Sequence, residues 1–195
     1  AVRGGVVMHG TMKRASKPNW RLKKTLSRRV EFRPIEAEDI RYAYAAYKKG
    51  ALKDMAGPFA ETGMTADEFN VQFQSVVPSR YHGAWTLFAE TKRGVIPVGM
   101  VFAFYSHADH ALSPFMIVGD ISWFPWATAR NRIEAAVYFF HVIRSTMPMV
   151  DYASGETNKR FFEMICQHGV MRRVGTTYNV VKDEPTAIYE TRGKT

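Results

Sequence analysis

The sequence of 195 residues is poor in cysteine and contains only Cys166. A single cysteine excludes a disulfide within the chain and argues against a zinc site built on thiolates. It is also typical of a protein made in a reducing compartment such as the cytoplasm. His107, Asp109 and His110 form the nearest approach to a metal-ligand cluster. We interpret them as solvated loop residues and predict no metal site.

The sequence also lacks a long apolar run. No stretch of about 18 apolar residues is present, so we expect no membrane span. The apolar patch within residues 1–14 is too short for a secretory signal peptide, and secretion by that route is not expected. Apolar residues make up 46% of the chain and aromatic residues 13%. This composition is typical of a globular domain with a packed core.

Acidic residues are absent from the first 29 residues, which contain nine basic ones. The whole chain has 27 basic and 18 acidic residues, so residues 30–195 carry equal numbers of each. We therefore predict a basic extended arm at 1–29 and one domain at 30–195. Such arms bind nucleic acid or acidic protein surfaces. A solubilising tail is the alternative, but such tails seldom contain a tryptophan. The expected docking residues are Lys13, Arg14, Lys17, Trp20, Arg21, Lys23, Lys24, Arg28 and Arg29.

Hydrophobic periodicity after the arm predicts the order β-α-α-β-β-β-α-β-α-β-β. The second helix begins with a capping box, Thr65-x-x-Glu68, and we expect it to end before Pro78. This order of elements predicts an α/β (α+β) fold, with a central mixed sheet covered by helices on both faces. Strands are expected at 30–34, 85–90, 97–105, 115–124, 149–154, 171–181 and 186–192. Helices are expected at 39–50, at 65–77, between Pro125 and Pro148, and at 157–169.

Four segments together resemble the GNAT superfamily of acyl-CoA-dependent N-acetyltransferases, over residues 30–192. They are "FRPIEAEDI", "PVGMVFAFY", "ISWFPWATARNR" and "NKRFFEMICQHGVMRRVGT". In the last segment Asn158 precedes Gly169 by eleven residues, as is usual in the family, and "VMRRVG" follows. The resemblance implies a mostly antiparallel twisted sheet whose fourth and fifth strands splay apart to admit the acyl-pantetheine.

The family holds the CoA pyrophosphate at the turn after the fourth strand, on backbone N–H groups that glycines leave accessible. Residues 124–136 contain no glycine. We expect Asn131 to replace one glycine in part through a left-handed conformation, and Ile133 to occupy space that the phosphates need. The resemblance therefore implies at most a vestigial CoA site. Its residues would be Thr128, Ala129, Arg130, Asn131, Arg132 and Asn158.

Two arginines near the start of this expected helix are electrostatically unfavourable, because a helix N-terminus carries partial positive charge. Arg130 and Arg132 could pair with phosphate oxygens, with Glu134, or with a neighbouring protein. The sequence leaves these alternatives open.

The catalytic groups implied by the resemblance are also incomplete. Active members often carry a tyrosine seven residues after the asparagine, as the acid that protonates the departing thiolate, and Ile165 stands there. A relocated tyrosine, Tyr138, Tyr152 or Tyr178, is the alternative. The fourth strand offers one carboxylate, Asp120, as a weak candidate for the general base. Asp120 could equally be a structural acid held by hydrogen bonds.

These departures favour a non-catalytic GNAT-fold protein for which we expect no cofactor. The turn also resembles GNAT-like proteins encoded by tailed bacteriophages, which implies a virion component, head-to-tail or internal, located in the virion or the host cytoplasm. Its partners would be other virion or assembly proteins, in a homo-oligomeric ring, with nucleic acid reached through the arm. The alternative is an active N-acetyltransferase that uses acetyl-CoA or CoA. A nucleic-acid-binding regulator ranks third, because no reading helix is recognisable.

Overall fold

The computed structural model describes residues 29–52, 59, 63–92, 94–106, 115–146, 150–154, 156–179 and 183–191. The predicted arm up to residue 28 and the loop containing His107 and His110 lie outside the described residues. Arg29 is described. Its backbone N–H donates to a carboxylate oxygen of Glu90, and its guanidinium pairs with Glu31.

The described chain forms seven strands, four α-helices and a short 3-10 helix, η1. The strands are β1 (Val30–Pro34), β2 (Gly83–Thr91), β3 (Gly94–Ser106), β4 (Phe115–Trp123), β5 (Val150–Ser154), β6 (Arg172–Asn179) and β7 (Glu184–Glu190). The helices are η1 (Ala37–Asp39), α2 (Ile40–Tyr47), α3 (Ala66–Arg80), α4 (Ala129–Thr146) and α5 (Glu156–Gln167).

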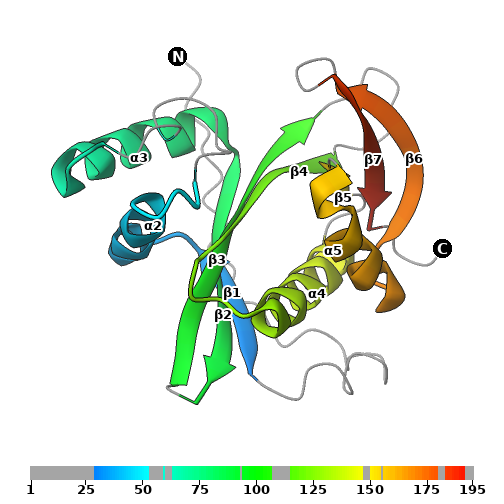
Figure 1. Cartoon of the computed structure of the whole chain (residues 1–195), viewed down its shortest axis with the longest axis horizontal. Coiled ribbons are helices and arrows are strands. Elements are labelled where there is room, and N and C mark those ends of the chain that lie inside the picture. Colours follow the sequence, from blue (N-terminus) through cyan, green and yellow to red (C-terminus); the bar gives the residue numbers. More distant parts are fainter. Residues whose placement is uncertain are drawn as a thin grey trace.

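All seven strands belong to one twisted sheet with the order β1-β2-β3-β4-β5-β7-β6 (Figure 1). Neighbouring strands are antiparallel, apart from the parallel pair β4 and β5. On β4, Asp120 pairs with Phe102 and Val118 with Ala103, so Gly119 is an extra residue that forms a β-bulge. The bulge lies in the middle of the strand that leads to the predicted CoA turn.

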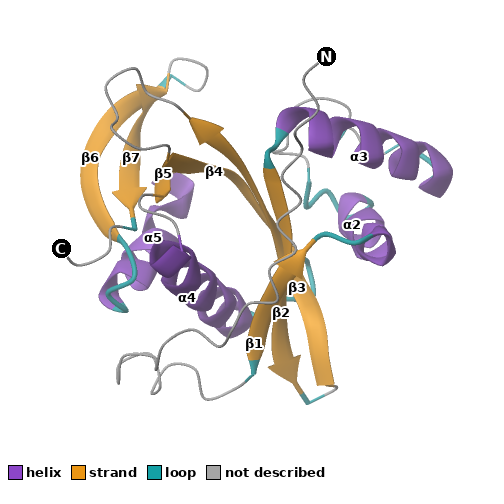
Figure 2. Ribbon diagram, turned by 180° about the vertical axis from the view of Figure 1, so that it is seen from behind, coloured by secondary structure: helices purple, strands orange, loops and turns teal. Residues whose placement is uncertain are grey.

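Helices cover both faces of the sheet and divide the core into two layers (Figure 2). On one face, α4 and α5 pack through Phe139, Phe140 and Phe162, all at most 1% exposed. On the other face, α2 and α3 pack through Tyr47 and Phe69. From Met100 to Ala103, successive residues of β3 alternate between the two layers, as the two-residue period of a strand requires. The bulge at Val98 shifts this alternation, so Val98 lies in the same layer as Val101.

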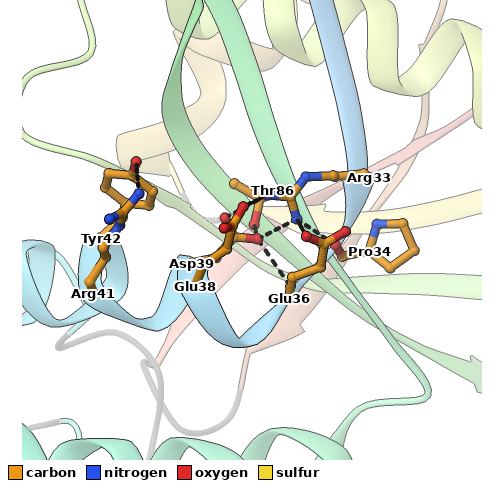
Figure 3. Close-up of polar contacts among 8 residues, drawn as sticks. All are labelled: Arg33, Pro34, Glu36, Glu38, Asp39, Arg41, Tyr42 and Thr86. Atoms are coloured by element: carbon orange, nitrogen blue, oxygen red, sulfur yellow. Dashed lines mark hydrogen bonds and ion pairs between the residues drawn. The ribbon is translucent and has the colours of Figure 1, made fainter.

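A buried carboxylate ties β1, η1 and β2 together (Figure 3). Asp39 is fully buried, and its two oxygens accept hydrogen bonds from the Arg33 guanidinium at 2.8 and 3.0 Å. The same carboxylate accepts from the Thr86 hydroxyl at 2.9 Å and from the backbone N–H of Glu36 at 3.0 Å. Every donor that the buried charge needs is therefore in place, which is the condition for burying a charge at all.

The predicted order of strands and helices is confirmed, and so is the mixed, mostly antiparallel sheet with helices on both faces. Several boundaries are wrong by two or three residues: α3 continues through Pro78 to Arg80, β3 begins at Gly94, and α2 ends at Tyr47. A proline removes only its own N–H from the helix ladder, and here that loss falls in the exposed last turn. The division into an arm and one domain stays a prediction.

Candidate functional site

The parallel strands β4 and β5 pair at only two positions, Met116 with Val150 and Ile117 with Asp151. Beyond these pairs β4 continues to Trp123 without a β5 partner, and the two strands separate (Figure 1). Since the strands are parallel, they open towards their carboxyl ends, where α4 follows β4 and α5 follows β5. We call the space between these ends the strand fork. The splaying that the sequence resemblance implied is present.

An aromatic pair bridges the strand fork. Trp123, the last residue of β4, contacts Phe161 of α5 edge-to-face, with ring centroids 5.6 Å apart. The indole ring lies against Gly99 of β3, where a Cβ would come within 2.7 Å of the ring atom Cε3. Trp123 and Phe161 are both half-buried and pack on the α4–α5 core layer. Side chains of this protein therefore meet across the space between the end of β4 and α5.

The first turn of α4 is closed by its own side chains. The backbone N–H of Asn131 donates to Thr128 Oγ1 at 3.2 Å, and the Thr128 hydroxyl donates to Asn131 Oδ1 at 2.6 Å. The Thr128 backbone N–H also approaches Asn131 Oδ1, at 3.4 Å. This reciprocal arrangement is a capping box with asparagine in the third helical position. One of the N–H groups that a helix N-terminus can offer to an anion is thus already used.

Two expectations about this turn are wrong. Asn131 lies inside α4 and is 3% exposed, and Asp183 is the only non-glycine residue with positive φ in the described part of the chain. The cap that Asn131 makes with Thr128 holds it in helical geometry. Ile133 is half-buried and packs on the α4–α5 core layer, because its position on the helix faces the sheet rather than the turn.

The two arginines of the turn have partners within the chain. Arg130 Nε pairs with Glu134 Oε1 at 2.7 Å, one helical turn away. Arg132 Nε donates to the backbone oxygen of Ala127 at 3.1 Å. The sequence left phosphate, Glu134 and a neighbouring protein open as partners of these arginines, and Arg130 pairs with Glu134. Glu134 is 3% exposed, and its second carboxylate oxygen, Oε2, has no hydrogen-bond partner among the described residues.

The position of the family's catalytic acid is apolar and buried. Ile165 is fully buried and packs in the α4–α5 core layer with Phe162. Among the tyrosines considered as substitutes, Tyr138 contacts Phe32 edge-to-face in the same layer. Tyr178 lies on β6, where its hydroxyl donates to the Asp183 carboxylate, and this hydrogen bond raises the pKa of Tyr178. A raised pKa means that the protonated phenol is the favoured form.

The structure gives the backbone positions of two further candidate residues, Asp120 and Asn158. Asp120 pairs with Phe102 beside the bulge at Gly119, and Asn158 lies in the first turn of α5. Their side chains lie outside the described part of the structure, so the role of Asp120 as a base stays a prediction.

Sequence reasoning missed the residues that close the site, although one signal was available. Thr128-x-x-Asn131 has the spacing of a capping box, the same spacing that identified Thr65 and Glu68, whose box is formed. The Trp123–Phe161 contact had no local signal, because it joins two elements that are distant in sequence.

The site contains no evident metal cluster. Within the described ranges, no three His, Cys, Asp or Glu residues are grouped so that they could hold a metal ion. None of the described helices combines the length and apolar character needed to cross a membrane.

Comparison with known proteins supports the fold. No family model and no curated protein sequence matches this chain. Among solved structures, a GNAT-family acetyltransferase from Bacillus anthracis superposes with a TM-score of 0.58 and 13% identity, covering 84% of this chain and 95% of that one. A spermidine N-acetyltransferase chimera from Vibrio cholerae superposes with a TM-score of 0.54 and 9% identity, covering 84% and 95%.

A third solved structure is a complex that contains CoA. The NatC complex bound to Gag peptide and CoA superposes with a TM-score of 0.50 and 8% identity, covering 85% of this chain and 99% of that one. At such low identities the likeness establishes the fold, which is that of the GNAT acetyltransferases. Function must be argued from the site itself.

Proposed function

We propose that this chain is a GNAT-fold binding protein that does not transfer acetyl groups. The observation that carries the proposal is the Trp123–Phe161 contact across the strand fork. In active members of the superfamily the acyl-pantetheine inserts between the fourth and fifth strands. An aromatic pair in that space must be displaced before a thioester can enter, and displacement costs the contact energy of both rings.

Two further features support the same conclusion. The first turn of α4 uses the Asn131 backbone N–H in its own capping box, which leaves less of the helix N-terminus for a pyrophosphate. The acid position holds the buried Ile165, which has no proton to give. Each feature removes a different part of the acetyl-transfer machinery: entry, phosphate binding and leaving-group protonation.

The remaining function is binding to a macromolecule, for which the basic arm is suited. Nine cations without an acidic residue attract nucleic acid or an acidic protein surface, and the binding should weaken as salt rises. The finer assignment, a component of a bacteriophage virion in contact with other virion proteins or DNA, stays a prediction from the sequence of the turn.

Calorimetric titration of the full chain with CoA and with acetyl-CoA tests the proposal. We expect no binding heat up to millimolar ligand. Trp123→Ala should bind CoA more tightly than the unchanged protein, because the substitution opens the strand fork. Trp126→Ala is the matched control: its half-buried indole packs on the opposite core layer and donates to the Pro97 oxygen. Micromolar binding by the unchanged protein, lost in Asn131→Trp, would overturn the proposal.

The second candidate is an active N-acyltransferase, and the retained separation of β4 from β5 favours it. In this case the aromatic pair would move aside on binding, and Asp120 would accept the amine proton directly or through one water. Release of free CoA thiol from acetyl-CoA in the presence of amines would support it. The rate should then fall at least about 100-fold in Asp120→Asn, the lower end of what a general base contributes. If no amine causes release of the thiol, the acyltransferase candidate is rejected and the binding function is retained.

A further inference from the structure

The edge strand β6 presents exposed side chains on both faces of the sheet. It lies at the end of the sheet order, beyond β7, at the outer margin of the molecule (Figure 2). Every described side chain of β6 is exposed, and Gly175 is half-buried. Four large hydrophobic residues are exposed in the described part of the chain, and two of them are on β6: Val174 at 46% and Tyr178 at 55%.

The opposite edge strand, β1, differs in each of these respects. It has five residues, ends at Pro34, and its Phe32 packs under Tyr138 and Phe139 of α4. Short length, a terminal proline and a covering helix are the usual ways in which a sheet edge is kept from pairing with another chain. On β6 neither a proline nor a helix has this role, since its eight described residues contain no proline and its side chains are exposed.

The charges of β6 favour one orientation of a second strand. Arg172 and Arg173 lie at its beginning, and Tyr178 lies near its end. A parallel copy of the strand would place the two arginine pairs opposite each other, which is repulsive. An antiparallel copy places the partner's Tyr178 opposite Arg172. A surface that is complementary to itself about a two-fold axis is what a symmetric dimer requires.

Gly175 lies at the centre of this antiparallel arrangement. With the axis at Gly175, Arg172 faces the partner's Tyr178 and Val174 faces the partner's Thr176. A Cβ at Gly175 would meet nothing within 4 Å, so the face of the sheet has room for a side chain at this position. The bulge at Val174 increases the local twist, and two-stranded ribbons tolerate larger twists than wide sheets.

The side chains at both ends of β6 are already held in place. The Arg172 guanidinium donates twice to the buried Glu190 carboxylate, at 2.7 and 2.9 Å. The Tyr178 hydroxyl donates to Asp183, and Arg173 donates to the Thr176 hydroxyl at 2.9 Å. Side chains that are ordered before association lose less entropy when they meet a partner.

We propose that β6 pairs antiparallel with β6 of a second copy of this chain, about a two-fold axis at Gly175, and joins the two sheets into one. The contact involves only one strand from each copy. Its buried area is therefore small, and we expect the dimer to form in a concentration-dependent way. It does not depend on whether the strand fork binds CoA.

Sedimentation velocity of the full chain over a concentration series tests this interface. We expect the weight-average mass to rise from 22.2 kDa towards twice that value. Tyr178→Lys places a cation opposite the partner's Arg172, and Tyr178→Glu places an anion there. Because the pair occurs twice in the dimer, we expect the dissociation constant to rise roughly five-fold in the first variant and to fall roughly five-fold in the second. Val71→Lys, on the exposed face of α3, is the control that should change nothing.

A cross-link tests the position of the axis. Cα atoms directly opposite in antiparallel strands are about 4.5–5.5 Å apart, which is within the range that a disulfide spans. Gly175→Cys should therefore form a covalent dimer under mild oxidation, whereas Val71→Cys and the unchanged protein should not. A monomer at every concentration, or a dimer whose dissociation constant shifts in the same direction in both Tyr178 variants, would overturn the proposal. Circular dichroism establishes that the variants are folded.

Discussion

Thr128 and Asn131 satisfy each other's polar groups at the start of α4. The hydroxyl of Thr128 accepts from the Asn131 backbone N–H and donates to the Asn131 side-chain oxygen, at 3.2 and 2.6 Å. In the resemblance to acetyltransferases these residues align with positions that face the pyrophosphate. In this structure they form a cap that stabilises the first turn of α4.

Removing the hydroxyl at this cap should destabilise the fold. Thr128→Ala leaves the Asn131 N–H without its acceptor, and losses of this kind cost about 1 kcal/mol. Thr128→Ser keeps the hydroxyl and should retain most of the stability. Urea unfolding of the three proteins measures the difference. Equal midpoints for the alanine variant and the unchanged protein would show that the cap contributes nothing.

The packing of Trp123 on β3 predicts different effects for two glycine substitutions. Gly99→Ala places a methyl group about where the indole ring now lies, and forced shifts of this kind cost about 1–3 kcal/mol. Gly175→Ala meets open space on β6 and should change stability little. Thermal unfolding of both variants provides the comparison. A Gly99→Ala variant as stable as the unchanged protein would contradict the close approach of Trp123.

The buried carboxylate of Asp39 should be more important than the exposed ones that share its arginine. Asp39→Ala removes the acceptor of Arg33 and Thr86 in the interior, and breaking a buried ion pair costs about 3 kcal/mol. Glu38→Gln changes an exposed partner of the same guanidinium, for which about 0.5 kcal/mol is the expected scale. Chemical denaturation at neutral pH separates the two cases. Similar losses in both variants would show that burial does not decide the contribution.

The capping box at the start of α3 should contribute stability that depends on pH. Hydrogen bonds from the Thr65 backbone N–H and hydroxyl lower the pKa of Glu68 below its ordinary value of 4.5. Because the folded-state pKa is the lower one, the contribution is complete above pH 4.5 and is lost as the pH falls through the folded-state value. The stability difference between the unchanged protein and Glu68→Gln should therefore shrink on acidification, in denaturation curves recorded from pH 7 downwards. A difference independent of pH would contradict this assignment.

Much of the fold could be predicted because its signals are local. Periodicity located the strands and helices, and the Thr65–Glu68 spacing identified a helix start that is formed. Gly50 and Gly169 follow helices and adopt φ of 71°, a conformation that glycine takes without steric cost. One local signal has two meanings. Thr128 and Asn131 were predicted to belong to a vestigial CoA site, and their spacing also fits the cap that they form.

The amino-acid sequence by itself determined the element order, the concentration of the excess positive charge in residues 1–29, and the absence of glycine from the turn after β4. These depend on residue identity and short spacing alone. Only the tertiary structure decided that Trp123 meets Phe161 across the strand fork, that Ile133 faces the core, and that β6 is left uncovered. Each of these is a contact, or the lack of one, between segments far apart in the chain, and sheet topology rather than local sequence brings such segments together.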